Sequence, residues 1–109
     1  TTLELSSRLP DTASMRRDIA LRKLRALKPL LARHNVRKVA VFGSTARDEA
    51  RPNSDIDLLV EFSKAPGLLD FVALKRELSA KLGGKVDLVT PGALHPRLKD
   101  AILAEAVYA

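Results

Sequence analysis

The 109-residue sequence contains no cysteine and no tryptophan. Without cysteine it can build neither a disulfide framework nor a thiolate metal site. Internal repeats and low-complexity tracts are absent as well. No apolar run approaches the roughly 20 residues that a bilayer-spanning helix needs, which excludes a membrane protein. There is also no charged and then apolar leader with a small-residue cleavage site, and we therefore expect a cytoplasmic protein.

Hydrophobic residues make up 46% of the sequence and charged residues 29%, which is the balance of a soluble globular protein. A chain of this length is long enough for one modest core and too short for two. Residues 1–12 carry little pattern. We therefore expect a poorly patterned N-terminal segment followed by a single domain over residues 13–109, with one active site at most.

The net charge of +6 is concentrated in the first half of the chain. Residues 1–52 hold twelve Lys and Arg against five Asp and Glu, whereas residues 53–109 hold seven against eight. Such a basic segment is either a solvated helix face or a surface for nucleic acid or an acidic partner. No aromatic residues are interleaved with the basic positions, which argues against a surface that stacks nucleic-acid bases.

Residues 14–34 have the pattern of an amphipathic helix. Four apolar residues recur at helical spacing on one face, namely Ala20, Leu24, Leu27 and Leu31. Three basic residues lie opposite, namely Arg22, Arg25 and Arg33. Pro29 falls inside this pattern and removes one helical hydrogen bond, so we expect a bend or a break into two shorter helices.

The rest of the sequence alternates strand and helix patterns. We expect a buried strand over residues 38–42, one or two helical turns over 44–50 and a strand over 55–62. A helix from about Phe71 to Leu82, ended by Gly83-Gly84, and a short strand over 85–89 follow. The spacing of Leu98, Ile102 and Ala106 predicts a final helix that runs to the chain end. This order predicts a small α/β domain built on a sheet of three strands or slightly more.

Two aspartates alternate with apolar residues in the strand expected over 55–62. Strand geometry places Asp55 and Asp57 on one face, so that their carboxylates can reach a common ion. The opposite face is entirely apolar, with Ile56, Leu58, Val60 and Phe62. Because neighbouring anions repel one another and no His or Cys is nearby, the pair suits Mg²⁺ or Mn²⁺ completed by phosphate oxygens and water. Taken alone, an Asp-x-Asp pattern more often marks a solvated strand face.

Two further features supply a context for this pair. Gly43-Ser44 follows the buried strand, where a glycine lets the backbone approach a phosphate and a serine hydroxyl adds a donor. Asp87 lies in the next strand and points away from its apolar neighbours. Each feature has an ordinary explanation by itself, as a turn or as an exposed strand residue. Arg47 is a candidate phosphate ligand or the partner of a surface salt bridge with Asp48 or Glu49.

Gly43-Ser44, followed after ten residues by Asp55-Ile56-Asp57 and then by Asp87 on a later strand, resembles the DNA polymerase beta nucleotidyltransferase superfamily. The neighbouring segments are similar to the minimal nucleotidyltransferases (MNT) of bacteria and archaea, namely residues 41–47, 54–60, 85–89 and 102–108. The resemblance covers about residues 20–108. It departs at Asp48, where the family usually has glycine, but this leaves the three aspartates in place.

The resemblance implies an α/β (α+β) fold, with a small mixed sheet flanked by helices, and a reaction with two metal ions. Asp55 and Asp57 would bind both Mg²⁺ ions, and Asp87 the ion beside the attacking hydroxyl. Two such ions can neutralise a triphosphate, lower the pKa of the nucleophile and stabilise the leaving pyrophosphate. Asp87 is then the candidate proton acceptor. The candidate phosphate ligands are Gly43, Ser44 and Arg47.

In the minimal members of the family, the partner is often a separately encoded helical ribonuclease toxin of the HEPN type. The small transferase is its antitoxin and adds AMP from ATP to a tyrosine of the toxin. We expect the same function here, with ATP or another nucleoside triphosphate as donor and a hetero-oligomer with a HEPN partner. One alternative is an antitoxin that neutralises by binding alone. Another is a nucleotidyltransferase that acts on RNA ends, which the basic charge of residues 1–52 favours.

Overall fold

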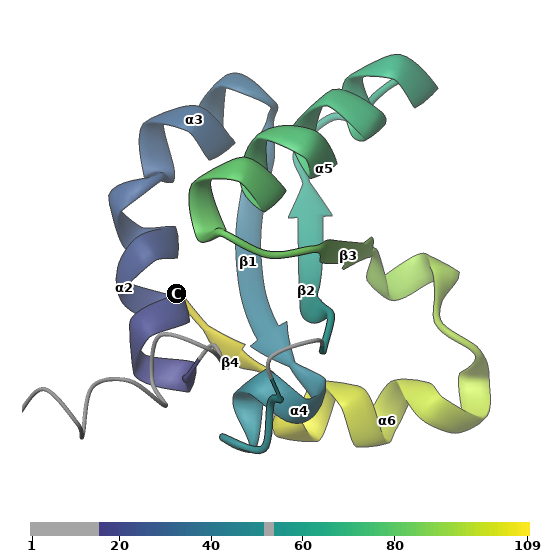
Figure 1. Ribbon diagram of the computed structural model, residues 1–109. Coiled ribbons are helices and arrows are strands. Elements are labelled where there is room, and N and C mark those ends of the chain that lie inside the picture. The colour runs from purple at the N-terminus through teal and green to yellow at the C-terminus, as the bar shows by residue number, and fades with distance from the viewer. Residues whose placement is uncertain (1–15, 52–53) are drawn as a thin grey trace, which may run out of the picture.

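The structure is a computed structural model that describes residues 16–51 and 54–109. At its centre is a four-stranded sheet with the order β3-β2-β1-β4, flanked by helices (Figure 1). The strands are β1 (Val36–Phe42), β2 (Ile56–Phe62), β3 (Val86–Val89) and β4 (Val107–Tyr108). The pairs β1–β2 and β1–β4 are antiparallel, and the pair β2–β3 is parallel. The expected mixed sheet is therefore confirmed. The segment expected over residues 1–12 lies outside the described residues.

The basic helical pattern near the N-terminus forms two helices, α2 (Arg17–Ala26) and α3 (Lys28–Arg33). Pro29 occupies the first turn of α3, where its missing N–H costs no helical hydrogen bond. The expected break is thus confirmed, although the first residues of the pattern lie outside the described part of the chain. The other helical elements are α4 (Gly43–Ala46), α5 (Leu68–Leu82), the 3-10 turn η1 (Pro91–Ala93) and α6 (Pro96–Glu105).

Helices cover both faces of the sheet. On one face α2, α3 and α5 pack against a core that includes Val41, Leu58 and Val86, all fully buried. On the other face Leu59 belongs to a smaller cluster that contacts Ile102 of α6. The alternation expected in β2 is therefore present, and the face that carries Asp57 is the one that α6 approaches.

The chain ends in a strand and not in a helix, so the expectation that the final helix runs to the end was wrong. Helix α6 stops at Glu105, and Ala106 has an extended backbone (φ −64°, ψ 136°). Val107 and Tyr108 then pair with β1 as strand β4. Valine and tyrosine favour strands, and β4 satisfies backbone groups that the edge of β1 would otherwise leave unpaired.

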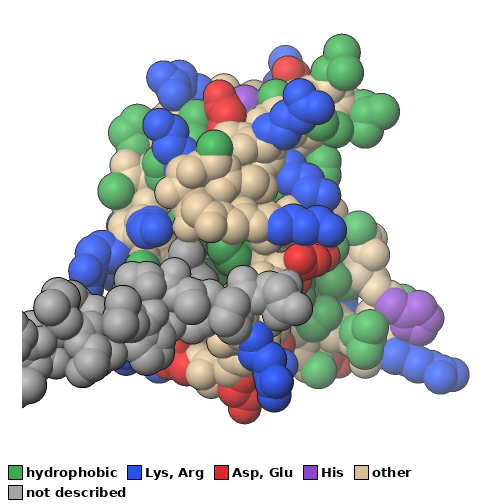
Figure 2. Space-filling view, in the orientation of Figure 1, with side chains coloured by type: hydrophobic (Ala, Val, Ile, Leu, Met, Phe, Trp, Pro, Cys, Tyr) green, Lys and Arg blue, Asp and Glu red, His purple; other side chains and the backbone are tan. Residues whose placement is uncertain are grey.

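The surface carries both basic and apolar regions. Figure 2 shows Lys and Arg side chains over α2, α3 and α5. Leu68 and Leu69, at the start of α5, are 78% and 84% exposed. Within residues 16–51 and 54–109, no helix is both long and apolar enough to cross a membrane.

Candidate active site

Residues far apart in the sequence meet in one row across the sheet. Asp57 of β2 is the register partner of Phe42, at the end of β1, and of Asp87 in β3. Because register partners in parallel strands point to the same side, the carboxylates of Asp57 and Asp87 project together. Gly43 follows Phe42 directly and thus lies beside Asp57. The structure therefore brings Gly43, Asp57 and Asp87 into one place.

Both the backbone conformation at position 43 and the close approach of a neighbouring side chain require glycine there. Its φ of +70° lies in the left-handed region that glycine adopts without steric cost. A Cβ atom built at this position would overlap Oδ2 of Asp57. The carboxylate of Asp57 thus packs directly against the backbone of the Gly43-Ser44 turn.

The turn after β1 carries the candidate phosphate ligands. Gly43–Ala46 form α4, and Ser44 is half-buried within it. Arg47 donates hydrogen bonds to Glu49 at 2.8 Å and to Glu105 at 2.9 Å. The salt bridge with Glu49, one of the two that the sequence suggested, is confirmed.

Asp48 has a different role from the one considered for it. Its φ of +57° is left-handed, a conformation that glycine takes most readily and that aspartate tolerates. Its Oδ1 accepts a hydrogen bond at 2.7 Å from the backbone N–H of Arg17, the first residue of α2. Asp48, at the position where the superfamily that the sequence resembles usually has glycine, therefore keeps the turn and adds a cap to α2.

Asp55 lies just before β2 and is exposed, with its Oδ2 4.0 Å from Nζ of Lys85. Its negative charge acts on the carboxyl of Asp57, as do the charges of Asp87 and Glu105. Burial is the largest cause, and together these effects raise the pKa of Asp57 from its ordinary 3.8 to about 6. Because a nearby cation would favour the ionised form, this carboxyl is suited to a cation-dependent site.

The carboxylates of the candidate site suit Mg²⁺ completed by phosphates and water better than a metal ion whose ligands all come from the protein. In the described part of the chain, no group of three His, Cys, Asp or Glu side chains is arranged to hold an ion by itself. Mg²⁺ is commonly held by one or two carboxylates, with substrate phosphates and water completing its shell. Asp57 and Asp87, whose carboxylates project to the same side of the sheet, supply two such ligands.

Glu105 was not among the residues predicted for the site. Its Oε2 accepts a hydrogen bond from the N–H of Gly43 at 2.9 Å, and its Oε1 pairs with Arg47 at 2.9 Å. Figure 1 shows α4 close to the end of α6, and the two helices are in contact. The signal in the sequence was an acidic residue beside Ile102 and Ala106, the apolar positions of the helix that the sequence predicted.

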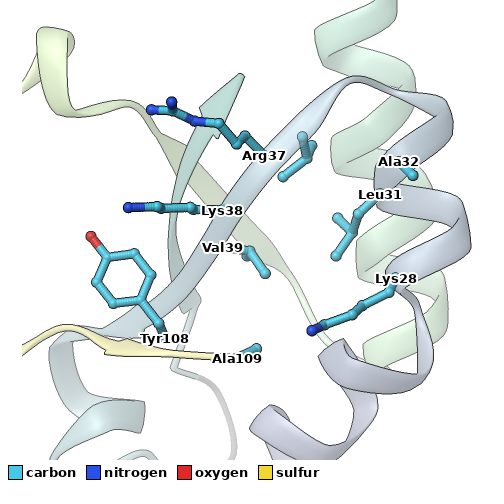
Figure 3. A pocket seen from close by; sticks show the side chains of 9 residues that line it. Lys28, Leu31, Ala32, Arg37, Lys38, Val39, Tyr108 and Ala109 are labelled. Atoms are coloured by element: carbon cyan, nitrogen blue, oxygen red, sulfur yellow. The ribbon is translucent and has the colours of Figure 1, made fainter. Parts of the chain in front are cut away.

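Two pockets in the described part of the chain are lined by none of the predicted site residues. A pocket of about 630 Å³ lies between α3 and the edge of the sheet (Figure 3). In it Nζ of Lys38 lies 5.9 Å from the ring centre of Tyr108, a cation–π contact. A second pocket, of about 580 Å³, adjoins the start of α5.

Comparison with known proteins identifies a family. A family model described as a nucleotidyltransferase domain matches residues 21–109. A Methanocaldococcus jannaschii protein assigned as a protein adenylyltransferase is 51% identical over 83 residues, which are 76% of this chain and 89% of that protein.

Solved structures share the fold. One, of a protein assigned as a minimal nucleotidyltransferase, is 44% identical with a TM-score of 0.74, and the match covers 85% of this chain and 95% of that one. Another is the complex of the tri-AMPylated Shewanella oneidensis HEPN toxin with its MNT antitoxin. It is 19% identical with a TM-score of 0.60, covers 82% of this chain and 70% of that one, and shows the fold alone.

Proposed function

The chain belongs to the nucleotidyltransferase domain family, and we propose that it transfers AMP from ATP to a hydroxyl group of a partner protein. The observation that carries this proposal is that Gly43, directly after β1, lies in one row with Asp57 of β2 and Asp87 of β3. This row places a backbone that a phosphate can approach next to carboxylates that favour a cation. Nucleotidyl transfer needs both, and their position on one face of the sheet supports the proposal.

The residues of the site divide into phosphate ligands and a base. The β- and γ-phosphates are bound by the N–H of Gly43, the hydroxyl of Ser44 and the guanidinium of Arg47. Asp87 accepts the proton of the attacking hydroxyl. The hydroxyl oxygen forms a bond to the α-phosphorus, the bond between the α-phosphorus and the oxygen bridging to the β-phosphate breaks, and pyrophosphate leaves.

The three aspartates would hold the metal. Asp55 and Asp57 would ligate two Mg²⁺ ions, with Asp87 as a further ligand to one of them, and Mn²⁺ suits the same oxygen donors. When bound, the ions supply positive charge that neutralises the triphosphate and the leaving pyrophosphate. Burial and the neighbouring carboxylates together raise the pKa of Asp57, and a cation that would offset both is the physical reason for this assignment.

For the acceptor we propose a tyrosine of a HEPN-type ribonuclease toxin, with this chain as its antitoxin in a hetero-oligomer. Similarity to a protein assigned as a protein adenylyltransferase supports a protein acceptor. The fold shared with an MNT antitoxin supports the kind of partner. An acidic partner surface could dock on the exposed arginines of α2 and α3, namely Arg22, Arg25 and Arg33.

The proposal is tested by incubating the purified chain with MgCl₂ and labelled ATP, with and without a candidate HEPN-type protein from the same organism, and measuring intact masses. We expect the partner to gain AMP only when this chain, ATP and Mg²⁺ are all present. Asp57→Asn should lower the rate about a hundredfold or more. Asp70→Asn is the matched control, because Asp70 is an exposed aspartate on α5 with no part in the site.

Two other results would redirect the proposal. A tight complex without AMP transfer, with neutralisation intact in Asp57→Asn, would identify an antitoxin that acts by binding. Nucleotide addition to RNA ends without a protein acceptor, weakened steeply by salt, would identify an enzyme that acts on RNA.

A further inference from the structure

Glu105, at the end of α6, makes two hydrogen bonds that the proposed reaction does not require. Its Oε2 accepts a hydrogen bond from the N–H of Gly43, and its Oε1 accepts one from Nη1 of Arg47, both at 2.9 Å. The side chain is 28% exposed, so it is held at the rim of the site and not in the core. These two donors are the ones that the proposed function gives to the phosphates.

A carboxylate and a phosphate group make the same kind of contact with such donors. Each presents anionic oxygens that accept charge-assisted hydrogen bonds from a backbone N–H and a guanidinium. We propose that Glu105 is an internal competitor of the triphosphate, a carboxylate that must release Gly43 and Arg47 before the β- and γ-phosphates can bind. This inference rests on the proposed function for the identity of the phosphate ligands.

The charges around Glu105 support competition and not joint binding. Its negative charge already acts on Asp57, together with those of Asp55 and Asp87. A triphosphate at Gly43 and Arg47 would add further negative charge beside it, and like charges at short distance repel. Neutralising Glu105 should therefore favour the nucleotide.

The local structure allows Glu105 to leave without unfolding the site. Arg47 has a second anionic partner in Glu49, at 2.8 Å, so the guanidinium stays positioned when Glu105 departs. The side chain of Glu105 is partly exposed, so its carboxylate can turn toward solvent by rotation of the side chain without a change in the backbone. The expected consequence is a lower affinity for nucleotides whose phosphates reach Gly43 and Arg47.

The test is the binding of Mg²⁺-ATP and of AMP, measured by isothermal titration calorimetry. We expect Glu105→Gln, which keeps an acceptor for the N–H of Gly43, to bind Mg²⁺-ATP about threefold to tenfold more tightly than wild type, and Glu105→Ala more tightly still. AMP lacks the β- and γ-phosphates, so its affinity should not change. Glu49→Gln is the matched control, because it removes a charge from Arg47 but does not contact Gly43.

The outcomes separate this inference from the function on which it rests. If wild type binds Mg²⁺-ATP and the folded Glu105 variants bind it with equal or lower affinity, the competition is overturned and the proposed function stays in place. Equal gains for ATP and AMP would also overturn it. Failure of wild type and of every variant to bind Mg²⁺-ATP would overturn both. Circular dichroism melts establish that each variant is folded.

Discussion

Asp57 connects the chemistry of the site to the stability of the fold. Burial, reinforced by Asp87, Asp55 and Glu105, raises its pKa from 3.8 to about 6. Between these values the native chain holds a proton that the unfolded chain has released, so the free energy of unfolding falls as pH rises through this interval. In EDTA we expect a decrease of about 1 kcal/mol in urea titrations between about pH 4 and pH 6, after allowance for solvent screening.

Substitution isolates this contribution. Asp57→Asn should remove this part of the pH dependence and be more stable than wild type at pH 7 in EDTA. Asp70→Asn should keep the wild-type profile, because Asp70 is exposed. If the free energy of unfolding of Asp57→Asn depends on pH as that of wild type does, the folded chain does not disfavour the ionised form of Asp57.

Gly43 and Gly83 form a matched pair, since both have left-handed backbones, with φ of +70° and +79°. An added Cβ at Gly43 would overlap Asp57, whereas one at Gly83 would meet no atom within 4 Å. We expect Gly83→Ala to lower the free energy of unfolding by about 1–2 kcal/mol and to keep the rate of transfer. Gly43→Ala adds the collision with Asp57, and should also reduce AMP transfer about a hundredfold.

Both variants are compared by urea denaturation and by transfer rates at a temperature where each is folded. Equal activity in the two variants would show that close packing of Asp57 on Gly43 is not needed for the reaction.

At the scale of elements, the turn after α4 stabilises the start of α2. Asp48 accepts a hydrogen bond from the backbone N–H of Arg17. The side chain of the N-cap residue makes no capping hydrogen bond to α2, so Asp48 supplies the cap instead. Asp48→Ala should cost about 1–3 kcal/mol, because it removes this cap and places a residue other than Gly, Asn or Asp in a left-handed conformation. Asp48→Gly should cost less, since it loses only the cap.

Asp48→Asn retains both the acceptor and the tolerance of φ +57°, and should be close to wild type. Chemical denaturation of the three variants gives the order Asn, Gly, Ala from most to least stable. If Asp48→Ala were more stable than Asp48→Gly, residue 48 would not keep its left-handed conformation in solution.

The sequence predicts those elements whose signals are local. The period of α2 and α3, the break at Pro29 and the end of α5 at Gly83 all depend on neighbours within a few residues. Strand β4 escaped prediction because two residues carry no period. It forms because an edge of β1, more than sixty residues earlier in the chain, offers unpaired backbone groups.

For the molecule as a whole, the candidate site was predictable from the sequence where a motif names its residues. The spacing of Gly43-Ser44 and Asp55-Ile56-Asp57 predicted which carboxylates and which turn to consider, and the structure places Gly43 beside Asp57. The alignment of Asp57 with Asp87 depends on the order β3-β2-β1, which hydrophobic periodicity does not specify. The position of Glu105 depends further on how α6 packs on the second face of the sheet. Tertiary packing, and not local pattern, decides these contacts.

The dispersion of the candidate site along the chain predicts how the whole fold responds to the proposed substrate. Gly43, Asp57 and Asp87 lie in different strands or the turns beside them, so on the proposed function only the folded chain would bind Mg²⁺-ATP. At a hundred times the Kd, such binding stabilises the folded state by about 3 kcal/mol. For a domain of this size, that should raise the Tm by roughly 10 °C in a thermal melt. ATP in EDTA should raise the Tm much less, because without Mg²⁺ the aspartates repel the triphosphate. An equal rise in Tm in EDTA would mean that the nucleotide binds away from these carboxylates.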